Sequence, residues 1–300
     1  TLGKGSRVVT ISGPPAMTKP TEAAVLAATH SVEARDIKAY DDAVSSAPLM
    51  GAPPPPGPVV ATREIPEIGV TEWTLKNGAH VVVKPTTFKN DEVRMVAFAP
   101  GGTSLARDAD YDSVRFASAI AAQGGVGSFD AVSLKKALAG KVVTVSTQIG
   151  DVDQELNATS TPADLESMLQ LVHLTFTAPR RDEGAFAAWK AAETESARNR
   201  RLSPDSRFYE DLIVFGTMNH PRRRPITTDT IAHVDYDKAL AFYKQRFGDA
   251  SGFTFVIVGN LDLARTKDLV EKYVGSLPAA GSHETWRGPN VNRPAGVAKK

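Results

Sequence analysis

The sequence predicts an α+β fold, an antiparallel-rich sheet with helices packed on one face, and three observations lead to this prediction. Strand-like runs come first, helical runs group in the middle, and a strand followed by a helix ends the pattern. Alternating runs surround Asn77 and Gly78 in VTEWTLKNGAHVVVKPT, the strongest short-range signal of a β-hairpin. The run FTFVIVGNL is continuously apolar, which is typical of a central strand.

The residues before this pattern resemble a connector. Residues 6–12 have the β-branched composition of a short strand, and residues 18–44 favour a helix with Thr21 as its N-cap. Four consecutive prolines at 53–56 then predict a stiff, extended spacer. Because Thr1 has no leader before it and RPAGVAKK has no cap, we expect a piece of a longer chain.

Four segments are therefore expected along the chain. We predict a terminal strand of a preceding domain at 1–18, a helical and Pro-rich linker at 19–62, one α+β domain at 63–279, and a linker toward a following domain at 280–300.

The domain is expected to contain these elements in order. The strands, rich in alternating or β-branched residues, are expected at 70–75, 80–86, 93–104, 141–151, 154–161 and 253–261. The helices, which show helical periodicity or caps, are expected from 111 into the glycine turn at 124–127, and at 128–140, 163–177, 185–198, 206–217, 236–248 and 263–274.

Composition excludes several classes of partner. The 35 Lys and Arg nearly balance the 34 Asp and Glu, so no global field attracts nucleic acid or an acidic membrane surface. No apolar run is long enough to span a bilayer. The chain has no cysteine, which excludes disulfides, a thiolate nucleophile and a Cys-based zinc site. A peptide, a protein or a small molecule is the expected partner.

The histidines do not suggest a metal site. No two are spaced to share a helical face as a metal pair would: His30, His80, His173, His220, His233 and His283. HSVEA at 30–34 has alanine where a second histidine would complete HxxEH, so we interpret it as a coincidence on a solvated helix. His173 lies between Val172 and Leu174, and we expect it to be packed in or at the edge of the core.

Two further motifs carry weak chemical signals. HPRRRP at 220–225 could hold a phosphate or a carboxylate through Arg222 to Arg224, but a charged loop between helices is favoured because no aromatics are interleaved. The glycines of AQGGVGSF follow a helix and lack the lysine of a phosphate loop, so they indicate a helix stop and turn. There is no GxSxG elbow. Residue chemistry alone therefore predicts no catalytic residue.

The order of motifs nevertheless resembles a known family. EWTLKNGAHVVVKPTTFKNDEVRMVAFAPGGTSLARDAD, then QGGVGSF, then LKKALAGKVVTVSTQIGDVDQELNATSTPADLESMLQLVHLTF resemble a domain of the pitrilysin/insulinase family of zinc metallopeptidases, over residues 63–277. The resemblance implies four homologous α+β domains that enclose a chamber. It also implies that one domain alone carries HxxEH, on the first helix after the Gly-Gly-Thr strand.

The resemblance places SVRFASAIA on that metal helix. Val114, Ala117 and Ser118 then stand roughly where His, Glu and His would be, and none of them can bind zinc or activate water. The third ligand of the family would fall near Glu193 and Glu195. We expect these two to be solvated helix carboxylates near Arg198, and the metal helix to be kept for packing.

These expectations lead to two functional hypotheses. The first is a noncatalytic domain of a zinc metallopeptidase that hydrolyses peptides, in which this chain forms part of the substrate chamber and lends a strand edge to peptide binding. The alternative is a purely structural or assembly module of a family member without peptidase activity. An independent enzyme using Arg222 to Arg224 on an anionic substrate is a third possibility, without a partnered acid or base.

The same resemblance implies cofactor, partners and location. We expect zinc on the catalytic domain of the full protein and no metal on this chain, which should be inactive alone. The expected partners are the catalytic half, on the same polypeptide or on a partner subunit, and peptide substrates. Long bacterial members of the family imply a periplasmic or exported protein.

Overall fold

The computed structural model describes residues 8–13, 16–33, 35, 48–282, 284–288, 291 and 293–296. The chain divides into two compact units, Thr1–Ala43 and Val44–Lys300. In the first unit, helix α1 (Glu22–Glu33) begins after Thr21, whose hydroxyl accepts a hydrogen bond from the backbone N–H of Ala24, as the sequence predicted. Residues 8–12 of the expected first strand form no strand, because no neighbouring strand pairs with them. Residues 34 and 36–44 of the expected helix lie outside the described residues.

The second unit is built on one open seven-stranded sheet with the strand order β1-β2-β3-β7-β4-β6-β5. Its strands, in chain order, are β1 (Val59–Ile65), β2 (Val70–Leu75), β3 (His80–Pro85), β4 (Val93–Pro100), β5 (Val143–Ile149), β6 (Asp153–Ser160) and β7 (Thr254–Gly259). The pair β3 and β7 is parallel, and the other neighbours are antiparallel. The FTFVIVGNL run is therefore the central strand that its continuous apolarity predicted.

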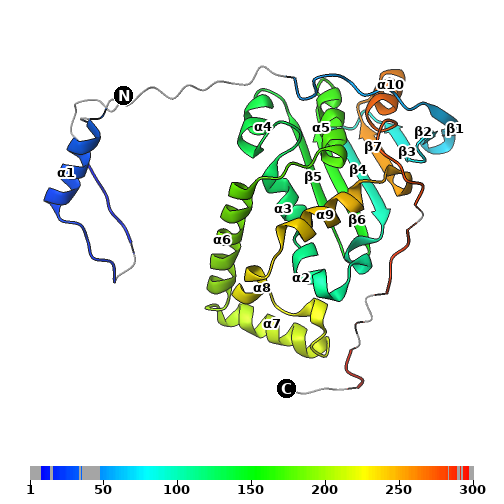
Figure 1. Cartoon of the computed structure of the whole chain (residues 1–300). Helices are drawn as coiled ribbons and strands as arrows, with labels where there is room; N and C mark the ends of the chain where they lie inside the picture. The colour runs from blue at the N-terminus through cyan, green and yellow to red at the C-terminus, as the bar shows by residue number, and fades with distance from the viewer. Residues whose placement is uncertain are drawn as a thin grey trace. The chain divides into compact units, whose positions relative to one another are not determined.

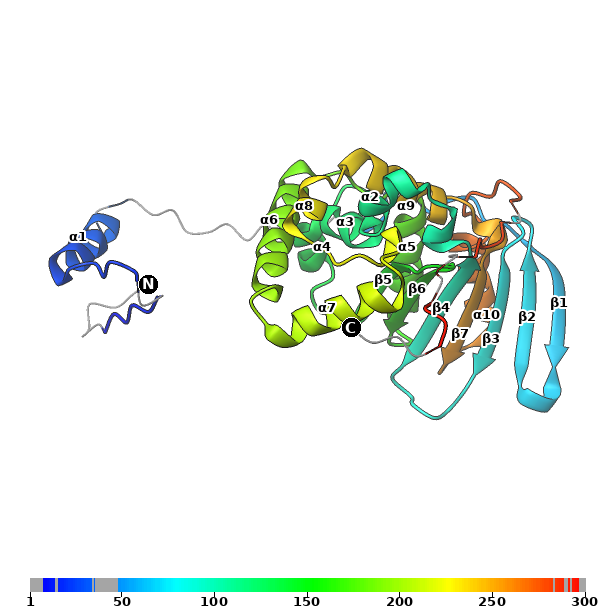
Figure 2. The same ribbon diagram turned by 90° about the horizontal axis from the view of Figure 1, so that it is seen from below.

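The helices of this unit lie on one face of the sheet (Figure 1). In chain order they are α2 (Tyr111–Val114), α3 (Ala117–Gly124), α4 (Ala131–Ala137), α5 (Leu165–Thr177), α6 (Glu183–Arg200), α7 (Pro204–Gly216), α8 (Thr228–Ala232), α9 (Tyr236–Phe247) and α10 (Leu263–Tyr273). Figure 2 shows α6, α7 and α8 grouped at the end of the helical layer far from β1. Strand β4 alternates between buried and exposed residues, so the opposite face of the sheet is open. The predicted α+β class is confirmed.

One strand was not predicted. The residues VVATREI form β1, which pairs antiparallel with β2 at the edge of the sheet. Five of its seven residues are exposed, and they lie on both faces of the strand. The strand therefore shows neither an apolar run nor an alternation of apolar and polar residues in the sequence. Strand β1 starts directly after the proline-rich spacer, across the boundary at residue 63 expected for the domain.

The helix expected from Tyr111 is divided into two. Helix α2 ends at Val114, the backbone N–H of Phe116 donates to the carbonyl of Ser113 in a tighter, three-residue turn, and α3 begins at Ala117. The prediction of one continuous helix is therefore wrong at this point. Its periodicity is preserved across the break because Val114, Ala117 and Ile120 are all buried in the core.

The core lies between this helical layer and the sheet. Its aromatic centre joins Phe176 of α5 and Phe247 of α9 to Phe253 and Phe255, with ring centroids 5.0–6.0 Å apart across the contacting pairs. Phe255 stands on β7, so the central strand and two helices share one cluster. The hairpin turn is fixed from outside, since the Asn77 side chain donates hydrogen bonds to the carbonyls of Val274 and Leu277.

His173 of α5 is packed in this core, as expected, with 7% of its surface exposed. Its Nδ1 lies 2.9 Å from the carbonyl oxygen of Tyr273, which can only accept a hydrogen bond, so Nδ1 carries the proton. Burial lowers the pKa of His173 below its usual value, and the hydrogen bond to Tyr273 opposes that shift without cancelling it.

We therefore predict that His173 makes the fold sensitive to mild acid. The unfolded chain has the higher histidine pKa, so it takes up a proton first as the pH falls through about 6.5, and the free energy of unfolding decreases there. Urea unfolding of the chain between pH ~7.5 and ~5.5 should show this decrease, and His173→Gln should flatten it. His233→Gln, at an exposed position of the same unit, is the control. An unchanged slope in the His173 variant would contradict the assignment.

Candidate functional site

Two of the three residues at the expected metal positions belong to the core. Val114 is 3% exposed and Ala117 is fully buried, so both pack inward where α2 meets α3. Ser118 is half-buried, and its hydroxyl oxygen is buried without a hydrogen-bond partner. The packing role expected for this segment is therefore observed for Val114 and Ala117. Neither a valine nor an alanine offers an atom that can hold a metal.

The two acidic residues expected near a third ligand lie on α6. Glu195 is exposed and forms an ion pair with Arg198, one helical turn further on, as the spacing predicted. Glu193 is half-buried on the same helix, so the expectation of a solvated carboxylate holds for Glu195 but not for Glu193. Over the part of the chain that the structure describes, no group of three or more His, Asp or Glu side chains is close enough together to hold a metal ion.

The arginine loop 220–225 is attached to other parts of the domain by side-chain hydrogen bonds, unlike a solvated loop. Arg222 donates from Nε to Asp108, and from its two Nη atoms to the carbonyls of Thr103 and Ala106, over 2.7–2.8 Å. Its guanidinium also lies 5.1 Å from the ring centroid of Tyr111. Arg222 therefore fastens the short helix η4 (Pro221–Arg223) to the turn that follows the Gly-Gly-Thr strand.

The other two arginines of this loop are also engaged. Arg223 forms an ion pair with Asp151 in the β5–β6 turn. Arg224 donates from Nε to the side-chain oxygen of Asn219 over 3.2 Å. The arginine side chains that the sequence suggested for binding a phosphate or a carboxylate therefore bind groups of the protein itself.

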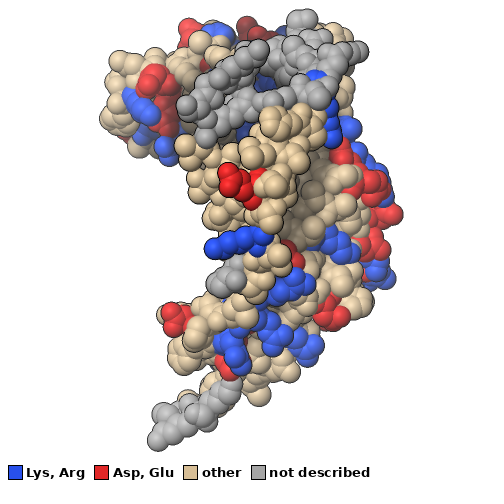
Figure 3. Space-filling model, turned by 90° about the vertical axis from the view of Figure 1, so that its left-hand side faces the viewer, with Lys and Arg blue, Asp and Glu red and all other residues tan. Residues whose placement is uncertain are grey.

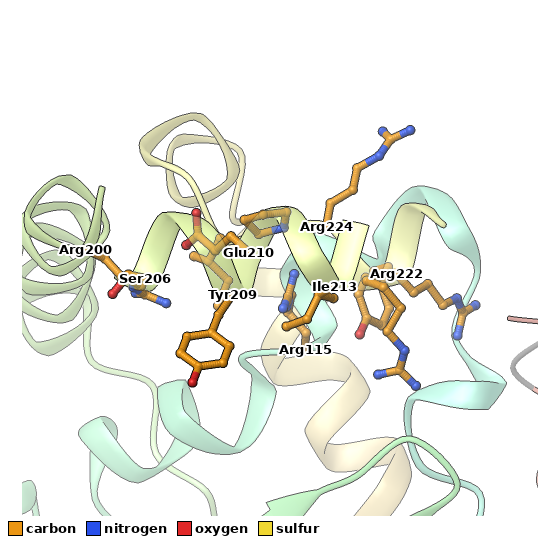
Figure 4. A pocket seen from close by; sticks show the side chains of 12 residues that line it. Arg115, Arg200, Ser206, Tyr209, Glu210, Ile213, Arg222 and Arg224 are labelled. Atoms are coloured by element: carbon orange, nitrogen blue, oxygen red, sulfur yellow. The ribbon is translucent and has the colours of Figure 1, made fainter. Parts of the chain in front are cut away.

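A cavity of about 440 Å³ opens beside this loop, between α7 and the α2–α3 break. We call it the arginine cavity; its principal lining residues are Arg115, Arg200, Tyr209, Glu210, Ile213 and Arg222. Figure 4 shows Arg115 between Tyr209 and Ile213, whereas Arg224 points away. On the face shown in Figure 3, Lys and Arg side chains gather where α6 ends and α7 begins.

Arg115 is one of several residues of this cavity that no sequence motif marks. Its guanidinium lies 5.3 Å from the ring centroid of Tyr111 and 5.6 Å from that of Phe116, half-buried between them. Among the described residues, no hydrogen bond or ion pair engages it.

Comparison with known proteins gives a consistent result. Residues 233–300 match the family model described as the peptidase M16 inactive domain. The chain is 32% identical over 249 residues, 82% of its length, to a zinc protease PQQL-like protein of Arabidopsis thaliana, and covers 23% of that protein. The chain thus spans about a quarter of the length of the curated relatives it matches.

Two solved structures share the fold. The periplasmic protease PqqL from Escherichia coli matches 94% of the chain with a TM-score of 0.74 and 21% identity, the chain covering 31% of it. The first half of the same protease, solved separately, matches 76% of the chain with a TM-score of 0.58 and 16% identity, the chain covering 50% of it. At these identities the structures show the fold alone.

The fold and the matched relatives together identify the class of protein: this is an α+β domain of the kind found in zinc proteases. The family follows from the sequence matches. The chain belongs to the peptidase M16 family, as an inactive domain of zinc protease-like proteins. No helix among the described residues has the length and apolarity needed to cross a bilayer.

The burial of Ala117 yields a sharp prediction about this site. Ala117→Glu places a carboxylate in the core without a partner, which should lower the free energy of unfolding by about 3–5 kcal/mol. Ala119→Glu, two residues further along α3 at an exposed position, should change it by less than about 0.5 kcal/mol. Urea unfolding of the two variants measures both values. If Ala117→Glu lowered the free energy of unfolding as little as Ala119→Glu is expected to, position 117 would be shown to accommodate a charged side chain.

Proposed function

We propose that this chain is a noncatalytic wall of the substrate chamber of a zinc metallopeptidase, whose zinc lies on another domain. One observation carries the proposal: the chain shares the fold of this protease family, while Val114 and Ala117 occupy core positions where the family resemblance would place metal-site residues. A domain that packs these positions can position a partner or a substrate, but it cannot supply the ligands of a catalytic zinc.

The proposed partner is the catalytic half of the same protein, on the same polypeptide or on a separate subunit. The chain resembles both the whole Escherichia coli protease and its first half, which supports a family chain composed of related halves. We further propose the expected segments at 1–18 and 280–300, and the expected linker at 19–62 up to the start of β1 at Val59, as the connections of this domain to its neighbours. The periplasmic location stated for the Escherichia coli protease supports a periplasmic or exported protein.

The strand β5 gives the proposed wall a means to contact a peptide. It lies at the end of the sheet, and among the described residues it pairs on one side alone, with β6. A free strand edge presents backbone N–H and C=O groups that an extended peptide can pair with, independently of its sequence. Its side chains alternate between half-buried and exposed, so an added strand would continue the same pleat.

The second candidate is a structural or assembly module in a protein without peptidase activity. The structure of the domain is compatible with both functions because neither requires a metal on this chain. An upstream half with an intact HxxEH would favour the peptidase.

We predict that peptide hydrolysis requires both halves and zinc. The 300-residue chain and the separately expressed upstream half should each leave a fluorogenic peptide intact, and their mixture should hydrolyse it. A chelator should abolish that hydrolysis, and added zinc should restore it.

Association of the halves is measured in parallel by analytical ultracentrifugation. Hydrolysis by the upstream half alone, at the rate of the mixture, would contradict a role for this chain in the chamber. Association without hydrolysis would favour the structural module instead.

A further inference from the structure

The arginine cavity has a charge that the protein itself leaves unmatched. Five arginines and one glutamate line it. Arg222 and Arg223 are paired with Asp108 and Asp151, and Arg224 is bonded to Asn219 and turned away (Figure 4). Two of the five arginine charges are therefore matched by aspartates, and because Arg224 is turned away, the unmatched charge inside the cavity comes from the other two arginines.

Arg115 and Arg200 supply that charge. Arg200 is half-buried and makes one long hydrogen bond, 3.5 Å, to the hydroxyl of Ser196. Arg115 is half-buried as well, and its contacts within the described residues are with aromatic rings. Glu210 lines the cavity but no ion pair joins it to either arginine in this part of the chain. A guanidinium carries five N–H donors in a planar fork, and those of Arg115 are left for a ligand.

Helix α7 contributes apolar surface to the cavity. Tyr209 and Ile213 stand one turn apart on α7 and are 63% and 50% exposed, although both are large hydrophobic residues. Helix α7 buries none of its residues. A ligand that places an anionic group on Arg115 can therefore lay an aliphatic or backbone portion against Tyr209 and Ile213.

We propose that the arginine cavity binds a carboxylate of a peptide, with Arg115 as the main donor. A carboxylate matches the guanidinium fork through two parallel hydrogen bonds, and the cavity volume of about 440 Å³ accommodates one side chain with its adjoining backbone. The apolar surface favours a peptide over inorganic phosphate, which has no carbon to place there. That the ligand is a peptide rests on the proposed function; that it is an anion rests on the cavity alone.

The carboxylate can come from an acidic side chain or from a C-terminus, and binding distinguishes the two. Three fluorescent peptides of one length are compared on the 300-residue chain by fluorescence anisotropy. One carries a central Glu and an amidated end, one a central Gln and an amidated end, and one a central Gln and a free C-terminal carboxylate.

We predict that at least one carboxylate peptide binds about tenfold more tightly than the neutral peptide, since hydrogen bonds to charged groups contribute factors of this size. Arg115→Gln should abolish the difference. Arg207→Gln, which removes an exposed arginine of α7 outside the cavity, should preserve it. Ile213→Glu should also abolish it, because it places an internal carboxylate in the lining of the same cavity without removing Arg115.

Several results would overturn the proposal. One is equal affinity of the unaltered chain for the three peptides. Others are a preference for the carboxylate peptide that survives in both Arg115→Gln and Ile213→Glu, or that is lost to the same extent in Arg207→Gln. The last is inorganic phosphate that binds as tightly as the preferred peptide. Melting temperatures of all variants identify any that fail to fold. If Arg115→Gln does not fold, Ile213→Glu replaces it as the test. The assay uses neither zinc nor the upstream half, so its failure is independent of the hydrolysis experiment.

Discussion

The insertion of β7 into the middle of the sheet is the constraint on which the rest of this domain depends. Phe255 and Ile257 of β7 are fully buried and pair with residues of β3 on one side and of β4 on the other. Because β3 and β7 are parallel, the chain must cross over between them, and everything from β4 to α9 forms part of that connection. The sheet is therefore complete when residues 254–259 are in place.

This topology also explains where the arginine cavity lies. The helices between β6 and β7 must return across one face of the sheet, and α6, α7 and α8 extend beyond its end (Figure 2). Arg222 then connects this outer group to the turn after the Gly-Gly-Thr strand through Asp108 and two carbonyls. The cavity forms in the space between, so its lining comes from segments almost a hundred residues apart in the sequence, from Arg115 on one side to Tyr209 on the other.

The buried metal-helix positions and the basic cavity support one view of how this domain works. Residues that point into the core at the α2–α3 break are apolar, whereas Arg115 of the same segment points into the cavity. The segment thus retains its packing through Val114 and Ala117 and offers a single charged group for binding. This division agrees with our proposal that the domain holds substrate and that catalysis takes place on another domain.

The sequence by itself determined the fold class, the hairpin at Asn77 and Gly78, the central position of the FTFVIVGNL strand and the packed state of His173, because local periodicity and turn chemistry encode these features. It did not reveal β1, whose exposed residues carry no periodic signal, or the break between α2 and α3, which the helical pattern continues through. Only the tertiary structure decided the roles of the arginines. Arg222 fastens a turn, whereas Arg115 faces a cavity. The hydrogen-bond acceptors of Arg222 lie more than a hundred residues away in the sequence, and no local pattern records that this guanidinium finds them in the folded chain.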